Sequence, residues 1–212
     1  MFRILVVGVK GFAKELLETV IQNDLKAEIT FYDDVSDDLP ERLFERFPII
    51  RSEQEASVYF RNVDVAFAIG VGHPRLRLKF LDKFSELGGK PTTVISPFAK
   101  IGAYKNIIGE GVCILTDAVL ETNNQIGRGS LIHVGALVSH DVSIGEFCEI
   151  SPRASLLGGV RIGDYSRLGT GCVILPRVSV GDNAVIGAGA VVTKDVMDGM
   201  TVGGIPARPL EK

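Results

Sequence analysis

A histidine and an aspartate lie side by side at positions 140 and 141, in the stretch LVSHDVSIGEF. An imidazole whose pKa is near its ordinary value of about 6.5 can accept a proton at neutral pH, as a general base must. A neighbouring carboxylate can fix the tautomer of the ring and raise its basicity. The alternative is that His140 is a polar side chain that points outward from a turn. The elements around the pair decide between these interpretations.

The segment that contains the pair is a repeat with a period of six residues. The residue two places before each aliphatic position is usually small, which suits a tight inward corner. Such a period is typical of a repeat architecture. We predict a triangular parallel β-helix in which each hexad supplies one short strand and a turn, and the aliphatic column fills the interior. The aliphatic positions are Ile108, Ile114, Leu120, Ile126, Ile132, Val138, Ile144, Ile150, Leu156, Ile162, Leu168, Ile174, Val180, Ile186 and Val192.

A second register is superimposed on the first, because glycine recurs every eighteen residues. Eighteen residues are three hexads, so we predict three strands in each coil and about five coils stacked at roughly 4.8 Å. We interpret these glycines as a corner that needs unusual backbone angles. The period does not give the handedness of the helix, although right-handed crossovers are the general rule. The glycines are Gly109, Gly127, Gly145, Gly163 and Gly181.

The first 96 residues have a different pattern, in which short apolar strands alternate with amphipathic helices. We predict strands in ILVVG, AEITFYDD, VDVAFAIGV and KPTTVIS, and helices in FAKELLETVIQN and PRLRLKFLDKFSELG. Strands separated by helices indicate a small Rossmann-like parallel sheet with crossover helices. The predicted fold is therefore an α/β domain over residues 1–96, followed by a β-helix with a carboxyl-terminal extension over residues 97–212.

The repeat, with IGDYSRLGTGCVILPRVSVGDNAVIGAGAVVTKDV and the ending VGGIPAR, resembles the hexapeptide-repeat acyltransferases. Their prisms are left-handed, an exception to the crossover rule. The whole chain resembles the bacterial sugar O- and N-acetyltransferases of the sialic-acid and bacillosamine type, especially those that acetylate the 4-amino group of nucleotide-linked amino sugars. This resemblance implies a nucleotide-sugar-binding first domain, an acyltransferase prism and a role in surface glycan biosynthesis. It also implies a homotrimer that binds acetyl-CoA in the groove between neighbouring prisms, with active sites between subunits.

The catalytic motif of that family, H-[DE]-x-x-I-G, matches the chain at residues 140–145. The resemblance implies that His140 is the general base and that Asp141 orients it. The backbone N–H of Gly158, in LLGG, is the expected donor to the developing oxyanion. Because the coenzyme supplies the leaving thiolate, no protein nucleophile is required.

Two positions depart from the pattern of the family. Glu149 stands where relatives often have a second histidine that contacts the coenzyme. It either accepts a hydrogen bond from the substrate amine or is a solvated acid. His133 stands where relatives commonly have asparagine, and it either touches the substrate or is an outward-facing turn residue.

The resemblance also implies contacts with coenzyme A. Main-chain groups of Thr170 and Ala188 are expected to hold it. Lys194 and Arg208, near the end of the chain, are expected to pair with its phosphates, since a cation beside a phosphate makes a strong charge-assisted contact. The alternative is that both are ordinary surface charges.

Six residues of the first domain match substrate contacts of the family. They follow predicted strands, where a glycine-rich turn lets the backbone approach a phosphate at a helix amino terminus. Relatives often have histidine at position 12, so the contact there differs in detail, and the two aspartates have a simple turn as their alternative. The six are Lys10, Gly11, Phe12, Asp33, Asp34 and Gly70.

The composition excludes several classes of function. A formal net charge of −3 without a dense Lys/Arg run argues against nucleic acid. The amino-terminal apolar stretch is too short for a signal peptide or membrane span, so we expect a cytoplasmic protein without a membrane partner. Three cysteines without a CxxC pair argue against a disulfide framework and a cysteine-rich zinc site, and we expect no metal.

Three alternative functions remain open. The first is transfer of acetyl to a hydroxyl of a sugar or sialic acid, which needs the same base. A prism with a zinc site needs convergent ligands, and only His133, His140 and a carboxylate are available. A purely structural or sugar-sensing prism would not bind acetyl-CoA.

Overall fold

The computed structural model describes residues 2–210. The chain divides into two compact units, Met1–Val94 and Ile95–Lys212. We describe each unit by itself.

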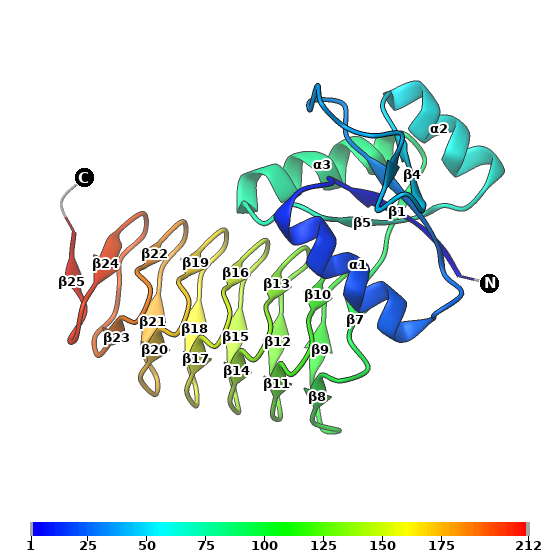
Figure 1. Ribbon diagram of the computed structural model, residues 1–212. Helices are drawn as coiled ribbons and strands as arrows, with labels where there is room; N and C mark the ends of the chain where they lie inside the picture. The colour runs from blue at the N-terminus through cyan, green and yellow to red at the C-terminus, as the bar shows by residue number, and fades with distance from the viewer. Residues whose placement is uncertain (1, 211–212) are drawn as a thin grey trace. The chain divides into compact units, whose positions relative to one another are not determined.

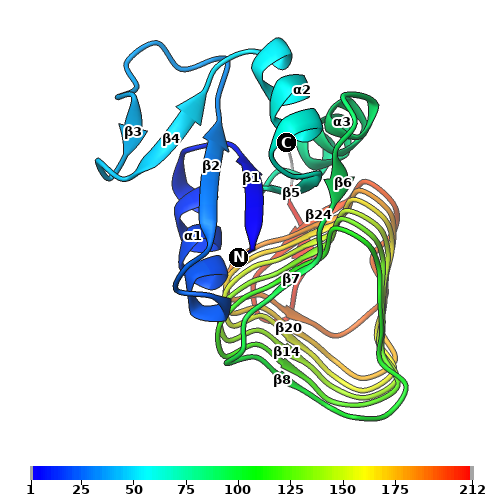
Figure 2. The ribbon, with the colours of Figure 1, turned by 90° about the vertical axis from the view of Figure 1, so that its right-hand side faces the viewer.

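The first unit is built on a sheet whose strands are parallel except for one hairpin. Its strand order is β3-β4-β2-β1-β5-β6, and only β3 pairs antiparallel, with β4. Helix α1 lies on one side of the sheet, and α2 and α3 lie on the other (Figure 2). The strands are β1 Arg3–Val7, β2 Glu28–Tyr32, β3 Arg42–Leu43, β4 Phe47–Ile50, β5 Ala66–Ile69 and β6 Lys90–Pro91, and the helices are α1 Gly11–Asn23, α2 Glu53–Asn62 and α3 Pro74–Glu86.

The order of the strands creates a crevice at the carboxyl ends of β1 and β5. From β1 the chain passes through α1 to β2 on one side, and later through α2 to β5 on the other side of β1. The connections therefore diverge between β1 and β5. In open parallel sheets, ligands bind outside the carboxyl ends of the strands at such a point.

The sequence patterns predicted the central elements of this unit and missed its edge. The strands ending in Val7, Tyr32 and Ile69, and the helices α1 and α3, lie where the apolar patterns indicated. Helix α2 and the β3–β4 hairpin were not predicted. The helix is short and mostly polar, although Ser52 and Glu55 form a capping box at its start.

One predicted strand is wrong in detail. The stretch KPTTVIS is divided between two sheets, because β6 ends the first sheet at Pro91 and the next strand, Val94–Ile95, pairs with the second unit. Proline is tolerated in β6 because β6 is an edge strand, and the last bond of its ladder is the one that the Thr92 N–H donates to the Phe67 carbonyl.

The second unit is a left-handed parallel β-helix, whose coils follow one another in Figure 1 and whose triangular outline is seen in Figure 2. Each side of the triangle is one parallel sheet. The last described strand of the chain joins one of these sheets in the antiparallel direction. The first sheet contains β7 Val94–Ile95, β10 Cys113–Ile114, β13 Leu131–Ile132, β16 Glu149–Ile150, β19 Arg167–Leu168, β22 Val185–Ile186, β24 Thr201–Gly203 and β25 Arg208–Pro209. The second contains β8 Lys100–Ile101, β11 Val119–Leu120, β14 Leu137–Val138, β17 Ser155–Leu156, β20 Val173–Ile174 and β23 Val191–Val192. The third contains β9 Ile107–Ile108, β12 Gln125–Ile126, β15 Ser143–Ile144, β18 Arg161–Ile162 and β21 Ser179–Val180.

The predicted periods are confirmed by the register of these sheets. Paired residues are eighteen apart through the middle coils, as Ile132 and Ile150 are, whereas the offset is nineteen between Ile101 and Leu120 and sixteen between Ile186 and Val202. The aliphatic column from Ile114 onward is buried in one continuous core, and the small residues before it are buried as well.

The explanation predicted for the repeated glycines is wrong. None of the five has a positive φ; the left-handed residues lie two places later, as at Gly129 and Phe147. Glycine is required for space instead, because a Cβ on Gly127 would collide with the carbonyl group of Gly145 in the next coil.

Candidate active site and nucleotide pocket

His140 and Asp141 lie in the turn that joins β14 to β15. The imidazole Nδ1 is 2.8 Å from the Asp141 carboxylate oxygen Oδ2. Because an ionised carboxylate can only accept, Nδ1 carries the proton and Nε2 keeps its lone pair. The pair is therefore arranged as a base and its orienting group.

Asp141 has a second partner, which the sequence analysis did not identify. The side-chain amide of Asn123 donates to the other carboxylate oxygen, Oδ1, over 2.6 Å. The hydrogen bond from Asn123, and then the one with His140, hold the pKa of Asp141 below its ordinary value. The carboxylate is thus ionised throughout the neutral range.

Gly158 occupies the same corner one coil further on, directly against the imidazole. A Cβ on this residue would lie 2.6 Å from His140 Cε1 and Nε2, so only glycine leaves room for the ring. Within residues 2–210, no acceptor receives the Gly158 N–H, whereas the next N–H, of Gly159, donates to the His140 carbonyl. The predicted oxyanion donor therefore lies beside the predicted base.

Glu149 and His133 lie together on the first side of the prism. Their surroundings differ from those of a solvated acid and of an outward-facing turn residue. His133 is buried, so it is not an outward-facing turn residue. Its Nε2 is 3.7 Å from Glu149 Oε1, and Arg167 Nε is 3.2 Å from Glu149 Oε2. The Glu149 side chain is only 16% exposed and has two partners, so it is not a solvated acid.

The residues predicted to hold coenzyme A are spread along the later coils. The Thr170 carbonyl accepts from the Gly189 N–H, which ties two coils together next to the exposed Ala188. Lys194 and Arg208 both line one hollow in the last coils, which has a volume of about 290 Å³. The structure thus brings the two cations together at the last coils.

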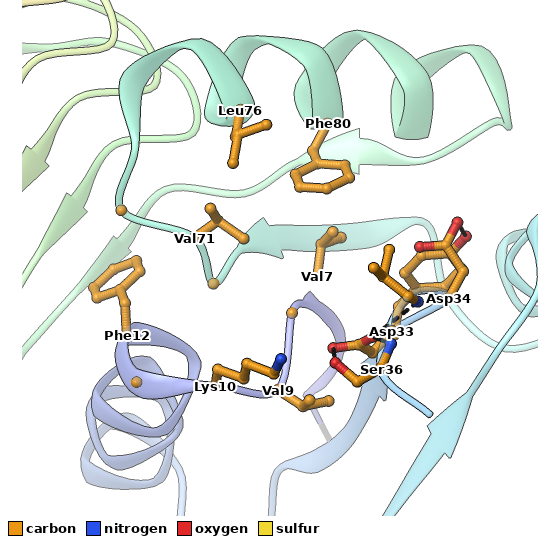
Figure 3. A pocket seen from close by; sticks show the side chains of 16 residues that line it. Val7, Val9, Lys10, Phe12, Asp33, Asp34, Ser36, Val71, Leu76 and Phe80 are labelled. Carbon is orange, nitrogen blue, oxygen red and sulfur yellow. Dashed lines mark hydrogen bonds between the residues drawn. The ribbon is translucent and has the colours of Figure 1, made fainter. Parts of the chain in front are cut away.

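The first unit contains a pocket of about 380 Å³ at the carboxyl ends of β1, β2 and β5. Figure 3 shows Asp33, Asp34 and Ser36 at one end of it and Phe12 at the other. Val7, Val71, Leu76 and Phe80 supply apolar walls. All six residues predicted for the nucleotide sugar line this pocket: Lys10, Gly11, Phe12, Asp33, Asp34 and Gly70.

Two of these residues also have structural roles. The Asp33 carboxylate accepts from the N–H groups of Val35 and Ser36, and so shapes the turn after β2. A Cβ on Gly70 would lie 2.7 Å from Ala13 Cβ, so glycine allows α1 to pack against the end of β5.

Asp34 belongs to a polar network at the rim of the pocket. Its Oδ2 accepts from the Tyr32 hydroxyl over 2.8 Å and from Lys83 Nζ over 3.2 Å. Burial opposes ionisation of Asp34, but these two hydrogen bonds outweigh it and lower its pKa. Burial is also the main cause that raises the pKa of Tyr32 to about 12, so the phenol stays protonated and donates.

Arg77 is another residue that the sequence does not single out. It lies in α3 with 1% of its surface exposed, and its Nη1 donates to the carbonyls of Ile69 and Val71, each over 3.0 Å. The guanidinium also lies over the Phe12 ring, 5.7 Å from its centroid. Arg77 therefore connects α3, the loop after β5 and the start of α1, which together form the pocket.

Among residues 2–210, no group of three His, Cys, Asp or Glu side chains is placed to hold a metal ion. No helix in that range is both long enough and apolar enough to cross a bilayer.

Comparison with known protein families covers both units. Residues 3–84 match the family described as PglD N-terminal domain, and residues 141–175 and 159–194 match the family described as bacterial transferase hexapeptide (six repeats). None of the curated proteins compared with the chain matches it.

Solved structures match the chain over almost its whole length. The acetyltransferase domain of PglB from Neisseria gonorrhoeae FA1090 is 32% identical, with a TM-score of 0.87, over 98% of this chain and 99% of that domain; it has also been solved with acetyl coenzyme A. WeeI from Acinetobacter baumannii AYE is 30% identical, with a TM-score of 0.89, over 99% of this chain and 100% of that one. PerB from Caulobacter crescentus, in complex with CoA and GDP-perosamine, is 26% identical, with a TM-score of 0.88, over 98% and 97%.

The prism, the histidine corner and these matches define an acyltransferase of the left-handed β-helix class. The chain spans nearly the full length of relatives that are at least 30% identical to it. It belongs to the hexapeptide-repeat sugar acetyltransferases, which use acetyl-CoA.

Proposed function

We propose that this enzyme transfers the acetyl group of acetyl-CoA to the 4-amino group of a nucleotide-linked deoxy amino sugar. The observation that carries the proposal is the His140–Asp141 pair, with a 2.8 Å contact, packed against Gly158. A related N-acetyltransferase has been solved with CoA and GDP-perosamine, which supports an amine on a nucleotide sugar as the acceptor. We place the product in surface glycan biosynthesis.

The reaction needs one proton to be moved twice. The amine nitrogen attacks the thioester carbonyl while His140 Nε2 accepts a proton from it. The Gly158 N–H donates to the oxyanion of the tetrahedral intermediate. When the carbon–sulfur bond breaks, the imidazolium returns the proton to the departing thiolate, so that amide and free coenzyme A are formed. Asp141 stabilises the imidazolium between the two steps.

The two units divide the recognition of the substrates. We assign the nucleotide to the first domain, residues 1–96, where α1 begins at the pocket lined by Lys10, Gly11 and Phe12, because the amino terminus of a helix suits a diphosphate. Asp33, Asp34 and Gly70 belong to the same binding surface, whereas His133 is assigned to the sugar. We assign acetyl-CoA to the prism, residues 97–212, through contacts with Thr170, Ala188, Lys194 and Arg208. Glu149 stands where relatives often have a histidine that contacts the coenzyme, and we assign it to the same binding surface.

We further propose that the enzyme is a cytoplasmic homotrimer whose active sites lie between subunits. The side chains of His140 and Asp141 are 59% and 55% exposed in the single chain, which leaves the base open to a neighbouring prism. Light scattering checks the trimer, since a monomeric mass with full activity would overturn it.

The test of the reaction is thiol release from acetyl-CoA against a panel of acceptors. The panel contains UDP-, GDP- and dTDP-linked 4-amino-6-deoxy sugars, the same sugars without nucleotide, and sialic acid. We expect turnover on one nucleotide-linked amine, which also identifies the base. Turnover on a hydroxyl acceptor alone would instead establish O-acetylation, which the His140–Asp141 pair can equally serve.

His140→Ala tests the mechanism. We expect kcat to fall by about a thousandfold, because general-base catalysis contributes 10²–10⁴-fold. The melting temperature should not change, since the side chain is more than half exposed. An unchanged rate in the folded variant would remove His140 from the mechanism.

A further inference from the structure

Asn123 is the first member of a three-residue chain of hydrogen bonds that ends at the base. Its Nδ2 is 2.6 Å from Asp141 Oδ1, and Asp141 Oδ2 is 2.8 Å from His140 Nδ1. Each carboxylate oxygen therefore has its own donor. A carboxylate that accepts a hydrogen bond at each oxygen cannot rotate without breaking one of the two bonds.

The backbone holds Asn123 and Asp141 in register. Asn123 has φ 59° and Asp141 has φ 60°, so both occupy the left-handed position of the same corner in successive coils. The Asp141 N–H donates to the Thr122 carbonyl over 3.1 Å, and the Asn123 N–H donates to the Tyr104 carbonyl over 3.0 Å. Asparagine and aspartate tolerate this conformation better than most residues. Both side chains therefore start from rigid, matched positions.

We propose that Asn123 is a positioning residue, which holds the Asp141 carboxylate in the orientation that His140 needs. The proposal rests on the function proposed above. A neutral amide is suited to this role because it satisfies the second oxygen without adding charge. A cation at the same place would compete with the imidazolium for the carboxylate, and a second carboxylate would repel Asp141.

Asn183 provides a matched control for substitutions at Asn123. It has φ 54° and lies at a left-handed corner on another edge of the prism, where there is no catalytic pair. Its backbone conformation is close to that of Asn123 and both residues are exposed, so equal substitutions at the two sites place similar demands on the backbone. The two sites differ in what the side chain contacts.

Asn123→Asp tests the electrostatic part of the proposal. The added carboxylate beside Asp141 should favour the imidazolium form of His140, so that the ring of the variant titrates at higher pH than that of the wild type. An NMR titration of the ring measures this shift without any substrate, so the result stands even if the acceptor panel fails. The acid limb of kcat/KM should move to higher pH by the same amount, whereas Asn183→Asp should move neither.

Asn123→Gly tests the positioning part. Glycine keeps the left-handed corner but removes the donor, and we expect kcat to fall about tenfold with the KM for acetyl-CoA unchanged. Asn183→Gly should retain the wild-type rate and a similar melting temperature. The proposal is overturned if Asn123→Gly keeps full kcat, or if the substitutions at 123 and 183 give the same titration curves.

Discussion

The prism and the first unit solve the problem of building a site in opposite ways. Through the middle coils of the prism the backbone contacts recur eighteen residues later, so the corner that carries His140 repeats the backbone hydrogen bonds of the corners before and after it. Only the side chains differ from coil to coil. In the first unit the pocket depends on contacts that occur once, such as those of Arg77 and Lys83. A repeated scaffold tolerates almost any outward residue, whereas the pocket depends on particular buried ones.

Gly127→Ala should give the largest loss of stability, because it breaks the repeat itself. The new Cβ would collide with the Gly145 carbonyl, and Gly145 is tied to the next coil by its N–H bond to Ile162. The backbone cannot yield without disturbing two coils. We expect a loss of about 3 kcal/mol in the free energy of unfolding, measured with denaturant.

The contrasting substitution is Gly11→Ala in the first unit. A Cβ on Gly11 would have no heavy atom within 4 Å, so the free energy of unfolding should change by less than about 0.5 kcal/mol. If both substitutions cost the same, crowding between coils is not the reason for the eighteen-residue glycine register.

These differences explain what the sequence could and could not predict. The strands, the three-sided coil and the position of the His140–Asp141 corner followed from periods of six and eighteen, because a repeat states the same rule many times. The glycine register was found but its cause was misjudged, since periodicity shows where glycine is needed and not whether φ or space requires it. Asn123 lies eighteen residues before Asp141, but the period shows only that their side chains stack in successive coils and not that they form a hydrogen bond.

The first unit was predicted less completely. The resemblance to the family, together with glycines and aspartates after apolar strands, indicated the pocket, and all six residues matched to substrate contacts line it. Arg77 and Lys83 could not be distinguished from the other basic residues of the same helix, Arg75 and Lys79. Burial of a cation among backbone carbonyls leaves no periodic signal.

Arg77→Met tests whether the pocket depends on that single buried cation. Loss of its bonds to the Ile69 and Val71 carbonyls should destabilise the protein by about 2 kcal/mol, since buried acceptors lose their donor. The loop after β5 and Phe12 should loosen together. We expect the KM for the nucleotide sugar to rise about tenfold, with the KM for acetyl-CoA unchanged.

Two measurements separate a local effect from general damage. Lys79→Met, at an exposed position of the same helix, should change neither KM nor stability. Hydrogen exchange in Arg77→Met should increase at residues 69–72 and stay unchanged in the prism. Equal loosening in both units would show that Arg77 serves the fold and not the pocket.

Arg167→Met should have the smallest effect, because it removes a surface charge from a scaffold that tolerates such changes. Arg167 is 48% exposed, so its 3.2 Å contact with Glu149 should contribute less than about 1 kcal/mol. The contact with His133, and then the charge of Arg167, outweigh burial and lower the pKa of Glu149.

The direction of the pH effect follows from that lowered pKa. A carboxylate with a depressed pKa stabilises the fold above its unfolded pKa of about 4.3, and the stabilisation is lost as the pH falls through the folded value. The stability difference between the wild type and Arg167→Met should therefore be present at pH 7 and smaller at a pH well below about 4.3. Arg161→Met, at the equivalent strand position on another side of the prism, should show no such dependence. A difference that is the same at both pH values would mean that Arg167 acts through packing of its aliphatic stem, and the outward charges of the prism would then matter as little as the repeat suggests.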